Sequence, residues 1–212
     1  MSTINGRACV VNGTPVDKVF SDGKQVYGRN LLADSGFESG KTPANYLWGD
    51  GKWEGRVFSV NGGAETYPSP MSRFMLEVAN FSTDSTTNLD QYALYPITPV
   101  IIKKGETWTY SYYYASAGSA TGKASDYLMT DDNSPIWELS MGHDPRETSG
   151  GQTTWHRFVK TWTADRDATV TMLRFGFVRP SISASWVCID NIKLEQSPTA
   201  TPWTAAPEDI LK

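Results

Sequence analysis

Residues 107–115 read TWTYSYYYA, and this stretch decides the fold class. Every second side chain, from Trp108 to Tyr114, is aromatic, whereas threonine, serine, tyrosine and alanine stand between them. Successive side chains of a β-strand point to opposite faces of the sheet, so this alternation predicts one aromatic face packed in a core. No convincing stretch of 3.6-residue periodicity accompanies it in the chain.

The rest of the chain divides short apolar segments from one another by clusters of Gly, Pro, Asn, Asp and Ser. We predict nine strands, at 56–60, 73–81, 90–96, 106–116, 125–130, 135–141, 155–163, 169–178 and 185–195. Many short strands bounded by turn residues are typical of a sandwich. The sequence therefore predicts an all-β protein, with a β-sandwich or jelly roll as its main part.

The two ends of the chain have patterns of their own. Residues 1–28 contain Asn12-Gly13 and Asp22-Gly23, dipeptides that favour tight hairpin turns, so we expect a small N-terminal β-hairpin or meander appendage there. Residues 197–212 contain three prolines and are expected to form an extended C-terminal strap until the last few residues. Cys9 and Cys188 are expected to be free thiols, with Cys188 buried.

Composition and charge exclude several classes of partner. The 212 residues are 39% hydrophobic with a net charge of −4, which is typical of a globular protein. No cluster of lysine and arginine is present, which argues against a nucleic-acid partner. No apolar segment reaches the length of a membrane span, so we expect no membrane partner.

Strand faces suggest where a sugar would bind. If the central strands are neighbours in one sheet, their second faces combine Tyr113, Glu138 and Arg174 with the small residues Ser140 and Gly176. Aromatic rings stack on sugar rings, and charged groups hydrogen-bond sugar hydroxyls, so such a surface predicts a saccharide groove. An ordinary solvated sheet face is the alternative.

Two loop segments supply further candidates. Residues 45–55, NYLWGDGKWEG, are too glycine-rich for a strand, so we expect Trp48 and Trp53 to be exposed ligand contacts. Alternatively, these tryptophans fold back over the edge of the sandwich. His143 lies in a long polar loop as a third candidate ligand contact, or as a side chain that hydrogen-bonds its own loop.

An enzymatic role finds little support. A glycoside hydrolase needs two carboxylates at a defined separation, and Asp131, Asp132 and Glu138 are the available set. Adjacent aspartates commonly form turns instead. No Ser-His-Asp order, nucleophile elbow, P-loop or HExxH motif is present. We expect no catalytic activity.

Four segments together resemble a known family: NLLADSGFESG (30–40), KKGETWTYSYYY (103–114), TTWHRFVKTWTA (153–164) and WVCIDNIKLEQ (186–196). They are similar to the jelly-roll carbohydrate-binding modules appended to xylanases, and the resemblance covers residues 29–196. It implies a jelly-roll β-sandwich of two antiparallel sheets there. The resemblance implies a structural calcium ion between the first and last strands, with Glu38 and Asp190 as its carboxylates. Alternatively, these two acids cap loops or pair with Lys or Arg. In that family the W-x-R motif, here Trp155 and Arg157, packs at a sheet edge.

The flanking segments VDKVFSDGKQVYGRNLL (16–32) and NIKLEQSPTATPWTAAPED (191–209) resemble the junctions around such modules in tail and baseplate proteins of phages of Gram-positive lactic-acid bacteria. This implies a non-catalytic module of a distal tail or receptor-binding protein, made in the bacterial cytoplasm and carried by the virion to the host cell surface. Its partners would be a host cell-wall polysaccharide or another saccharide, and other tail proteins. The alternative is a structural adaptor domain that contacts tail proteins and binds no sugar.

Overall fold

The computed structural model describes residues 8–40, 47–48, 53–59, 74–80, 90–118, 127–131, 155–178 and 185–211. Their regular elements are β1 (Val10–Val11), β2 (Thr14–Pro15), β3 (Lys18–Ser21), β4 (Lys24–Gly28), β5 (Leu47–Trp48), β6 (Trp53–Ser59), β7 (Phe74–Asn80), β8 (Asp90–Ile102), β9 (Thr107–Gly118), β10 (Tyr127–Thr130), β11 (His156–Thr163), β12 (Ala168–Val178), β13 (Ser185–Glu195) and the helix α1 (Pro207–Ile210).

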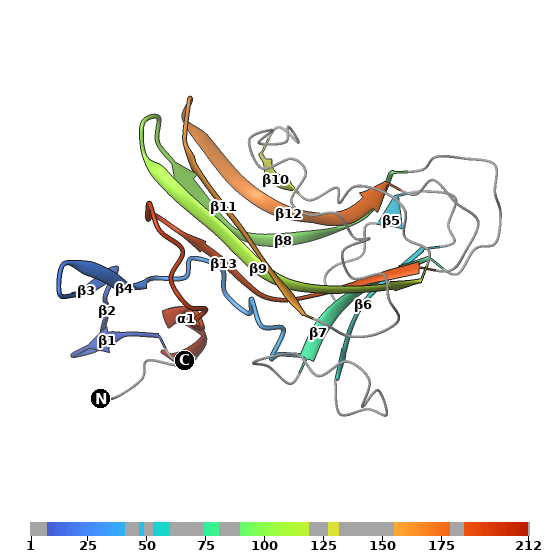
Figure 1. The fold of residues 1–212 in the computed structure, drawn as a ribbon, viewed down its shortest axis with the longest axis horizontal. Helices are drawn as coiled ribbons and strands as arrows, with labels where there is room; N and C mark the ends of the chain where they lie inside the picture. Colours follow the sequence, from blue (N-terminus) through green and yellow to red (C-terminus); the bar gives the residue numbers. More distant parts are fainter. Residues whose placement is uncertain are drawn as a thin grey trace.

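Two antiparallel sheets form the body of the protein and stack as two curved layers (Figure 1). The first has five strands in the order β11-β9-β13-β7-β6, and the second has four in the order β10-β12-β8-β5. The predicted all-β sandwich is therefore confirmed. Eight predicted strands correspond to strands of the structure, and the ninth, 135–141, lies outside the described residues.

The aromatic row of β9 lies in the core between the two sheets, as predicted. Trp108, Tyr110, Tyr112 and Tyr114 are all buried. The Tyr112 ring meets Phe175 of β12 edge to face, with 5.8 Å between ring centroids, so the contact joins one sheet to the other. Edge-to-face pairs of this kind stabilise a core beyond the area that they bury.

The N-terminal segment forms two separate hairpins, β1–β2 and β3–β4. Asn12 and Gly13 have φ of 50° and 78°, and Asp22 and Gly23 have φ of 52° and 76°. Positive φ at both central residues is the requirement of the tight hairpin turn that these dipeptides favour. The predicted hairpin appendage is confirmed, as two two-stranded units.

The C-terminal segment leaves β13 and runs without regular structure until α1, as the prolines predict. Arg29, just after β4, pairs with Glu208 of α1, so the end of the β3–β4 hairpin and the C-terminal helix lie next to each other (Figure 1). Cys188 is buried on β13, as predicted, and both cysteines are free thiols.

Candidate functional site

The sandwich separates two of the predicted sugar-binding residues. Tyr113 stands between the buried Tyr112 and Tyr114 on β9, so it belongs to the outer face of the five-stranded sheet. Arg174 stands between the buried Leu173 and Phe175 on β12, on the outer face of the four-stranded sheet. The prediction of one shared surface is therefore wrong, because β9 and β12 belong to different sheets. Glu138 and His143 lie outside the described residues.

On the outer face around Tyr113, the neighbouring arginine is tied to the strap. Arg157, its partner across β11 and β9, holds its guanidinium carbon 6.0 Å from the centroid of the Tyr113 ring. Arg157 Nη2 also donates a hydrogen bond of 2.6 Å to the carbonyl of Thr201 in the strap. Arg157 lies on β11, the edge strand, as the resemblance implied. Tyr113 is thus half-buried next to an exposed arginine that is bonded to the strap.

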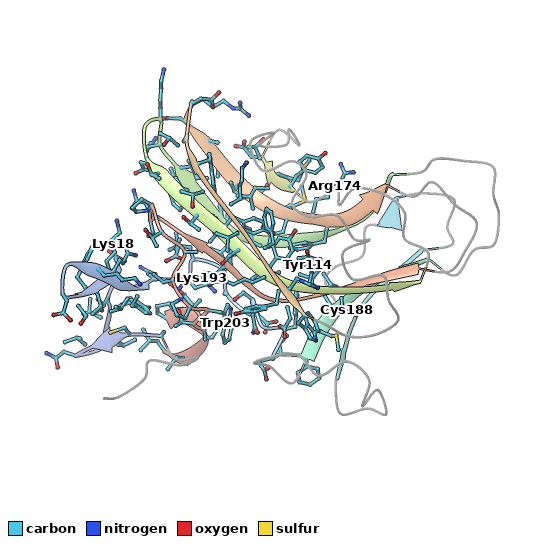
Figure 2. The ribbon with its side chains drawn as sticks, in the orientation of Figure 1. Lys18, Tyr114, Arg174, Cys188, Lys193 and Trp203 are labelled. Atoms are coloured by element: carbon cyan, nitrogen blue, oxygen red, sulfur yellow. The ribbon has the colours of Figure 1, made fainter. Side chains whose placement is uncertain are left out.

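The outer face of the four-stranded sheet carries a different arginine and tyrosine. Tyr127 of β10 is the register partner of Arg174, and the guanidinium carbon lies 4.9 Å from the centroid of the Tyr127 ring. Both residues are half-buried. Figure 2 shows Arg174 on this sheet, with Tyr114 in the core below it. An arginine over an aromatic ring makes a cation–π contact, and its planar guanidinium carries several N–H donors.

Strand register places one predicted tryptophan on the same face. Gly176 of β12, Tyr92 of β8 and Trp48 of β5 form one row across the sheet, two residues along from Arg174. The expectation that residues 45–55 are too broken for a strand is wrong at this position, because Leu47–Trp48 pairs with β8. The structure describes the backbone of Trp48 but not its side chain.

Trp53 lies elsewhere in the fold. It begins β6 opposite Asn80 of β7, at the edge of the five-stranded sheet. Backbone pairing with β7 explains why its glycine-rich surroundings still form a strand. Trp48 and Trp53, predicted as one loop cluster, therefore stand in different sheets, and only Trp48 shares a sheet with Arg174.

Tyr127 is a residue that sequence reasoning missed. The sequence predicts a strand at 125–130, but its faces are not assigned from the pattern. The next residue, Leu128, is fully buried, so the two-residue period directs Tyr127 outward. The sequence does contain a signal for an outward tyrosine here, because Tyr127 precedes an apolar Leu128 in a strand bounded by polar residues. It cannot identify Arg174 as the partner, because sheet order is not written in local sequence.

The predicted calcium carboxylates differ in their surroundings. Glu38 is exposed in the turn that follows Phe37, whereas Asp190 is fully buried on β13. Asp190 Oδ1 accepts a hydrogen bond of 2.6 Å from the backbone N–H of Asn191. Both side-chain polar atoms of Asn191 are buried with no hydrogen-bond partner among the described residues. Its orphaned oxygen beside a buried carboxylate fits a hard cation, whereas its orphaned nitrogen does not.

The described donors nevertheless fall short of a complete metal site. Calcium takes about six to eight oxygen ligands. Among the described residues, no group of three or more histidine, cysteine, aspartate or glutamate side chains is arranged to hold a metal ion. The calcium site at Glu38 and Asp190 therefore stays a prediction, with Asn191 as a further oxygen donor beside it.

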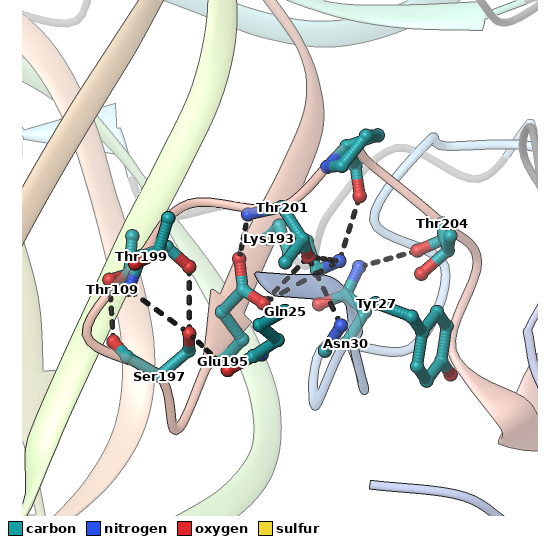
Figure 3. A network of polar contacts seen from close by, with 12 residues as sticks. Gln25, Tyr27, Asn30, Thr109, Lys193, Glu195, Ser197, Thr199, Thr201 and Thr204 are labelled. Atoms are coloured by element: carbon teal, nitrogen blue, oxygen red, sulfur yellow. Dashed lines mark hydrogen bonds and ion pairs between the residues drawn. The ribbon is translucent and has the colours of Figure 1, made fainter. Parts of the chain in front are cut away.

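A buried polar network ties the strap to β13 (Figure 3). Lys193 Nζ donates hydrogen bonds to Thr201 Oγ1 at 2.7 Å and to the carbonyl of Pro202 at 2.8 Å. The Glu195 carboxylate accepts hydrogen bonds from the N–H and the hydroxyl of Thr201, at 2.9 and 2.7 Å. We call Lys193, Glu195 and Thr201 the strap clamp. Its members come from β13 and from the strap that folds back over it.

Burial sets the charge of the strap clamp. Removal of Lys193 from water lowers its pKa to about 8, although the nearby Glu195 acts in the opposite direction. Arg157 lowers the pKa of Lys193 slightly further, because it is a second positive charge. Desolvation is the main cause, as expected for an ammonium group that is fully enclosed.

The strap clamp also binds the second N-terminal hairpin, β3–β4. The N–H of Gly28, at the end of β4, donates to Thr201 Oγ1 at 3.1 Å. A Cβ atom at Gly28 would lie 1.9 Å from Glu195 Oε2, so only glycine fits this approach. Asn30 continues the contact, because its Nδ2 donates to the carbonyls of Ile192 and Thr204, both at 3.0 Å. The hairpin β3–β4, the strap and β13 therefore pack together, and we call this end of the protein the attachment end.

None of the described helices combines the length and the apolar character needed to cross a membrane.

Comparison with known proteins identifies the fold. No family model and no curated protein matches the sequence. Among solved structures, a chain of the tripod from the baseplate of bacteriophage Tuc2009 is similar with a TM-score of 0.51 and 20% identity, over 86% of this chain and 61% of that one. The module TmCBM61 in complex with β-1,4-galactotriose matches with a TM-score of 0.50 and 13% identity, over 80% of this chain and all of that one.

A third structure shares the fold within a larger protein. An arabinose-bound GH51 α-L-arabinofuranosidase matches with a TM-score of 0.57 and 12% identity over 79% of this chain. This chain spans only 26% of that enzyme. At these identities the comparisons show the shared β-sandwich, which carbohydrate-binding modules and phage baseplate proteins both use.

Proposed function

We propose that this chain is a non-catalytic carbohydrate-binding module of a phage tail protein. The sugar would bind on the outer face of the four-stranded sheet, around Tyr127 and Arg174. The task would be adhesion of the virion to a cell-wall polysaccharide at the surface of a Gram-positive host.

One observation carries this proposal: the Arg174 guanidinium carbon lies over the Tyr127 ring, 4.9 Å from its centroid, on a sheet face whose next row ends at Trp48. Aromatic rings provide the apolar surface on which the C–H face of a sugar stacks, and a fixed guanidinium donates hydrogen bonds to hydroxyl or acidic oxygens. On the other sheet, the guanidinium of Arg157 beside Tyr113 donates a hydrogen bond to the strap.

Likeness of fold supports both parts of the proposal. TmCBM61 binds a galactotriose in its structure, and the tripod belongs to a phage baseplate. Transfer of either property to this chain is our inference. Weak single sites are sufficient for adhesion when many copies act together, because avidity rises without any new contact.

Catalysis is not part of the proposal. Asp131, one of the carboxylates that a hydrolase would use, is exposed just after β10. Asp132 and Glu138 lie outside the described residues. Incubation of the chain with a bound polysaccharide should release no new reducing ends, and release that depends on Asp132 or Glu138 would replace this view by a hydrolase.

The deciding experiment is binding of a fluorescent fusion of the whole chain to Gram-positive cells and their purified wall polysaccharides, with free monosaccharides as competitors. Strain-selective labelling that a sugar competes is expected. Tyr127→Ala and Arg174→Gln should each weaken binding by about tenfold, which corresponds to about 1.4 kcal/mol of lost contact.

The other sheet supplies matched control variants. Tyr113→Ala and Arg157→Gln change the same residue types on the opposite face, and they should leave sugar binding unchanged once thermal unfolding shows that each variant is folded. If the control pair abolishes binding and the Tyr127 and Arg174 variants do not, the site is assigned to the wrong sheet.

A structural adaptor is the second candidate function, and the strap clamp favours it. An adaptor needs a rigid attachment end, and here Gly28, Glu195 and Thr201 fix hairpin and strap to the sheet. A folded fusion that is presented in many copies and labels no strain would support the adaptor over the sugar-binding module.

A further inference from the structure

The turn of the first hairpin, β1–β2, exposes an asparagine directly before a glycine. Asn12, Gly13 and Thr14 are all exposed, and a Cβ atom added at Gly13 would meet no atom within 4 Å. Among the described residues, nothing forms a hydrogen bond with the side chain of Asn12 or with the N–H of Gly13. The side-chain amide of Asn12 and the backbone nitrogen that follows it are therefore both accessible to water.

The other two asparagines whose side chains the structure describes have different surroundings. Asn30 and Asn191 are 0% and 1% exposed. The N–H of the residue that follows each of them, Leu31 and Ile192, donates a hydrogen bond of 3.0 Å to a backbone carbonyl. An amide packed in this way has little freedom to rotate toward the following nitrogen and is shielded from water. Of these three asparagines, only Asn12 is therefore open to a reaction between its side chain and its own backbone.

We propose that Asn12 is a site of spontaneous deamidation, through a cyclic imide formed with Gly13. The Gly13 nitrogen gives its proton to solvent and bonds to the Asn12 side-chain carbon Cγ, and the Cγ–Nδ2 bond breaks to release ammonia. Glycine favours this step because it has no side chain to shield its nitrogen. Water then opens the ring at either of its two C–N bonds, which leaves aspartate or isoaspartate at position 12. The net reaction converts an amide and water into a carboxylate and an ammonium ion, with no oxidation or reduction.

The folded turn should slow this reaction only slightly. At the first central residue of a turn of this type ψ is about 30°, which holds the Gly13 nitrogen away from the Asn12 side chain, so ring closure must follow opening of the turn. The strands β1 and β2 pair through two residues each, Val10–Val11 with Thr14–Pro15, and they form a sheet of their own. An isolated hairpin is at most marginally stable in water, so the turn opens often. This inference does not depend on sugar binding.

Peptide mapping of the aged whole chain tests the proposal. Trypsin releases each of the three asparagines in a separate peptide, at residues 8–18 for Asn12, 30–41 for Asn30 and 175–193 for Asn191. After several days at about pH 8 and about 37 °C, the 8–18 peptide should be one mass unit heavier and should separate into aspartate and isoaspartate forms. The other two peptides should be unchanged, as should all three from a chain kept at about pH 5. Equal conversion of the three asparagines would overturn the proposal.

A synthetic peptide of residues 8–18 measures how far the fold protects Asn12. Deamidation of Asn12 in the whole chain should be at most about tenfold slower than in this peptide, which corresponds to a cost of at most about 1.4 kcal/mol for opening the turn. Protection beyond this factor would show that the turn stays closed, and it would overturn the proposal. Two further Asn-Gly pairs, at 5–6 and 61–62, lie outside the described residues and in other tryptic peptides, so they do not disturb this comparison.

Asn12→Gln is the variant that tests the ring. It keeps the amide and the charge, but its longer side chain would have to close a larger and less favourable ring with Gly13. The 8–18 peptide of this variant should therefore gain no mass under the same conditions, even though glutamine suits the turn less well than asparagine and lets it open more often. A mass gain at the wild-type rate, or a wild-type product that contains aspartate without isoaspartate, would indicate direct hydrolysis of the side-chain amide and would overturn the role of Gly13.

Discussion

Lys193 Nζ lies 3.8 Å from Glu195 Oε2, and the two side chains are 0% and 1% exposed. Removal of one partner from such a pair leaves an uncompensated buried charge, which typically costs about 3–5 kcal/mol. We therefore expect Lys193→Met to lower the free energy of unfolding by this amount in urea titrations.

The double variant Lys193→Met/Glu195→Gln is the control for that prediction. It removes both charges, so its loss of stability should be clearly smaller than that of Lys193→Met alone. Equal losses in the single and the double variant would mean that the pair contributes through packing and not through charge.

Stability should depend on pH through Lys193. Its pKa is about 8 in the folded protein and about 10.5 when unfolded, so between these values the unfolded chain binds more protons. Stability therefore rises with pH from 8 to 10.5, by at most about 1.4 kcal/mol per pH unit, and below pH 8 the full cost of the buried charge is present. The measurement is the difference in free energy of unfolding between wild type and Lys193→Met/Glu195→Gln at each pH. A difference that stays flat across this window would contradict a buried ammonium group.

Gly28→Ala should destabilise the attachment end. Its added Cβ would meet Glu195 Oε2 at 1.9 Å, so the carboxylate must move away from Thr201. Overpacking of this kind costs about 1–3 kcal/mol. Gly28 does not have positive φ, so backbone strain adds nothing, and chemical denaturation measures the crowding directly.

Gly13→Ala separates crowding from strain. Gly13 has φ of 78° and open space around it, so its cost comes from the backbone alone, about 1 kcal/mol. Combination with Glu195→Ala, which removes the side chain that the added Cβ would meet, should lower the cost of Gly28→Ala and leave that of Gly13→Ala unaltered. If the costs of Gly28→Ala and Gly13→Ala respond in the same way to the change at Glu195, the close approach of Gly28 to Glu195 does not explain the cost of Gly28→Ala.

Local alternation predicted the fold well, because it is imposed by the strand itself. The aromatic row of residues 107–115 identified the core face before any neighbour was known.

One strand, β8, is longer than predicted, and the reason lies in how its neighbouring strand pairs with it. The strand predicted at 90–96 continues to Ile102 through Pro96 and Pro99, and β5 pairs only with residues 92 and 93 of β8. A proline, which has no N–H to donate, is tolerated where a strand edge is unpaired.

The site was less predictable, because it depends on contacts between distant segments. Alternation placed Tyr113 and Arg174 outward correctly but could not assign them to different sheets. Lys193 and Glu195 alternate with apolar residues on β13, a pattern typical of a solvated face. The strap, which folds back over them through Thr201, and the end of β4 at Gly28 turn that face into a buried one.

Calcium binding remains to be measured, and we predict that it stabilises the protein through β13. Asp190 is fully buried, and the side-chain oxygen of its neighbour in sequence, Asn191, has no hydrogen-bond partner among the described residues, so an ion bound there would give that oxygen a partner. Addition of calcium to chelator-treated protein should raise the thermal midpoint, with a gain of about 2.7 kcal/mol at one hundred times the dissociation constant. Asp190→Asn and Asn191→Ala should each reduce this gain, whereas Glu38→Gln reports whether the exposed carboxylate takes part. The same midpoint with calcium and with chelator would show that these residues hold no calcium, and would leave the polar atoms of Asn191 to a buried water.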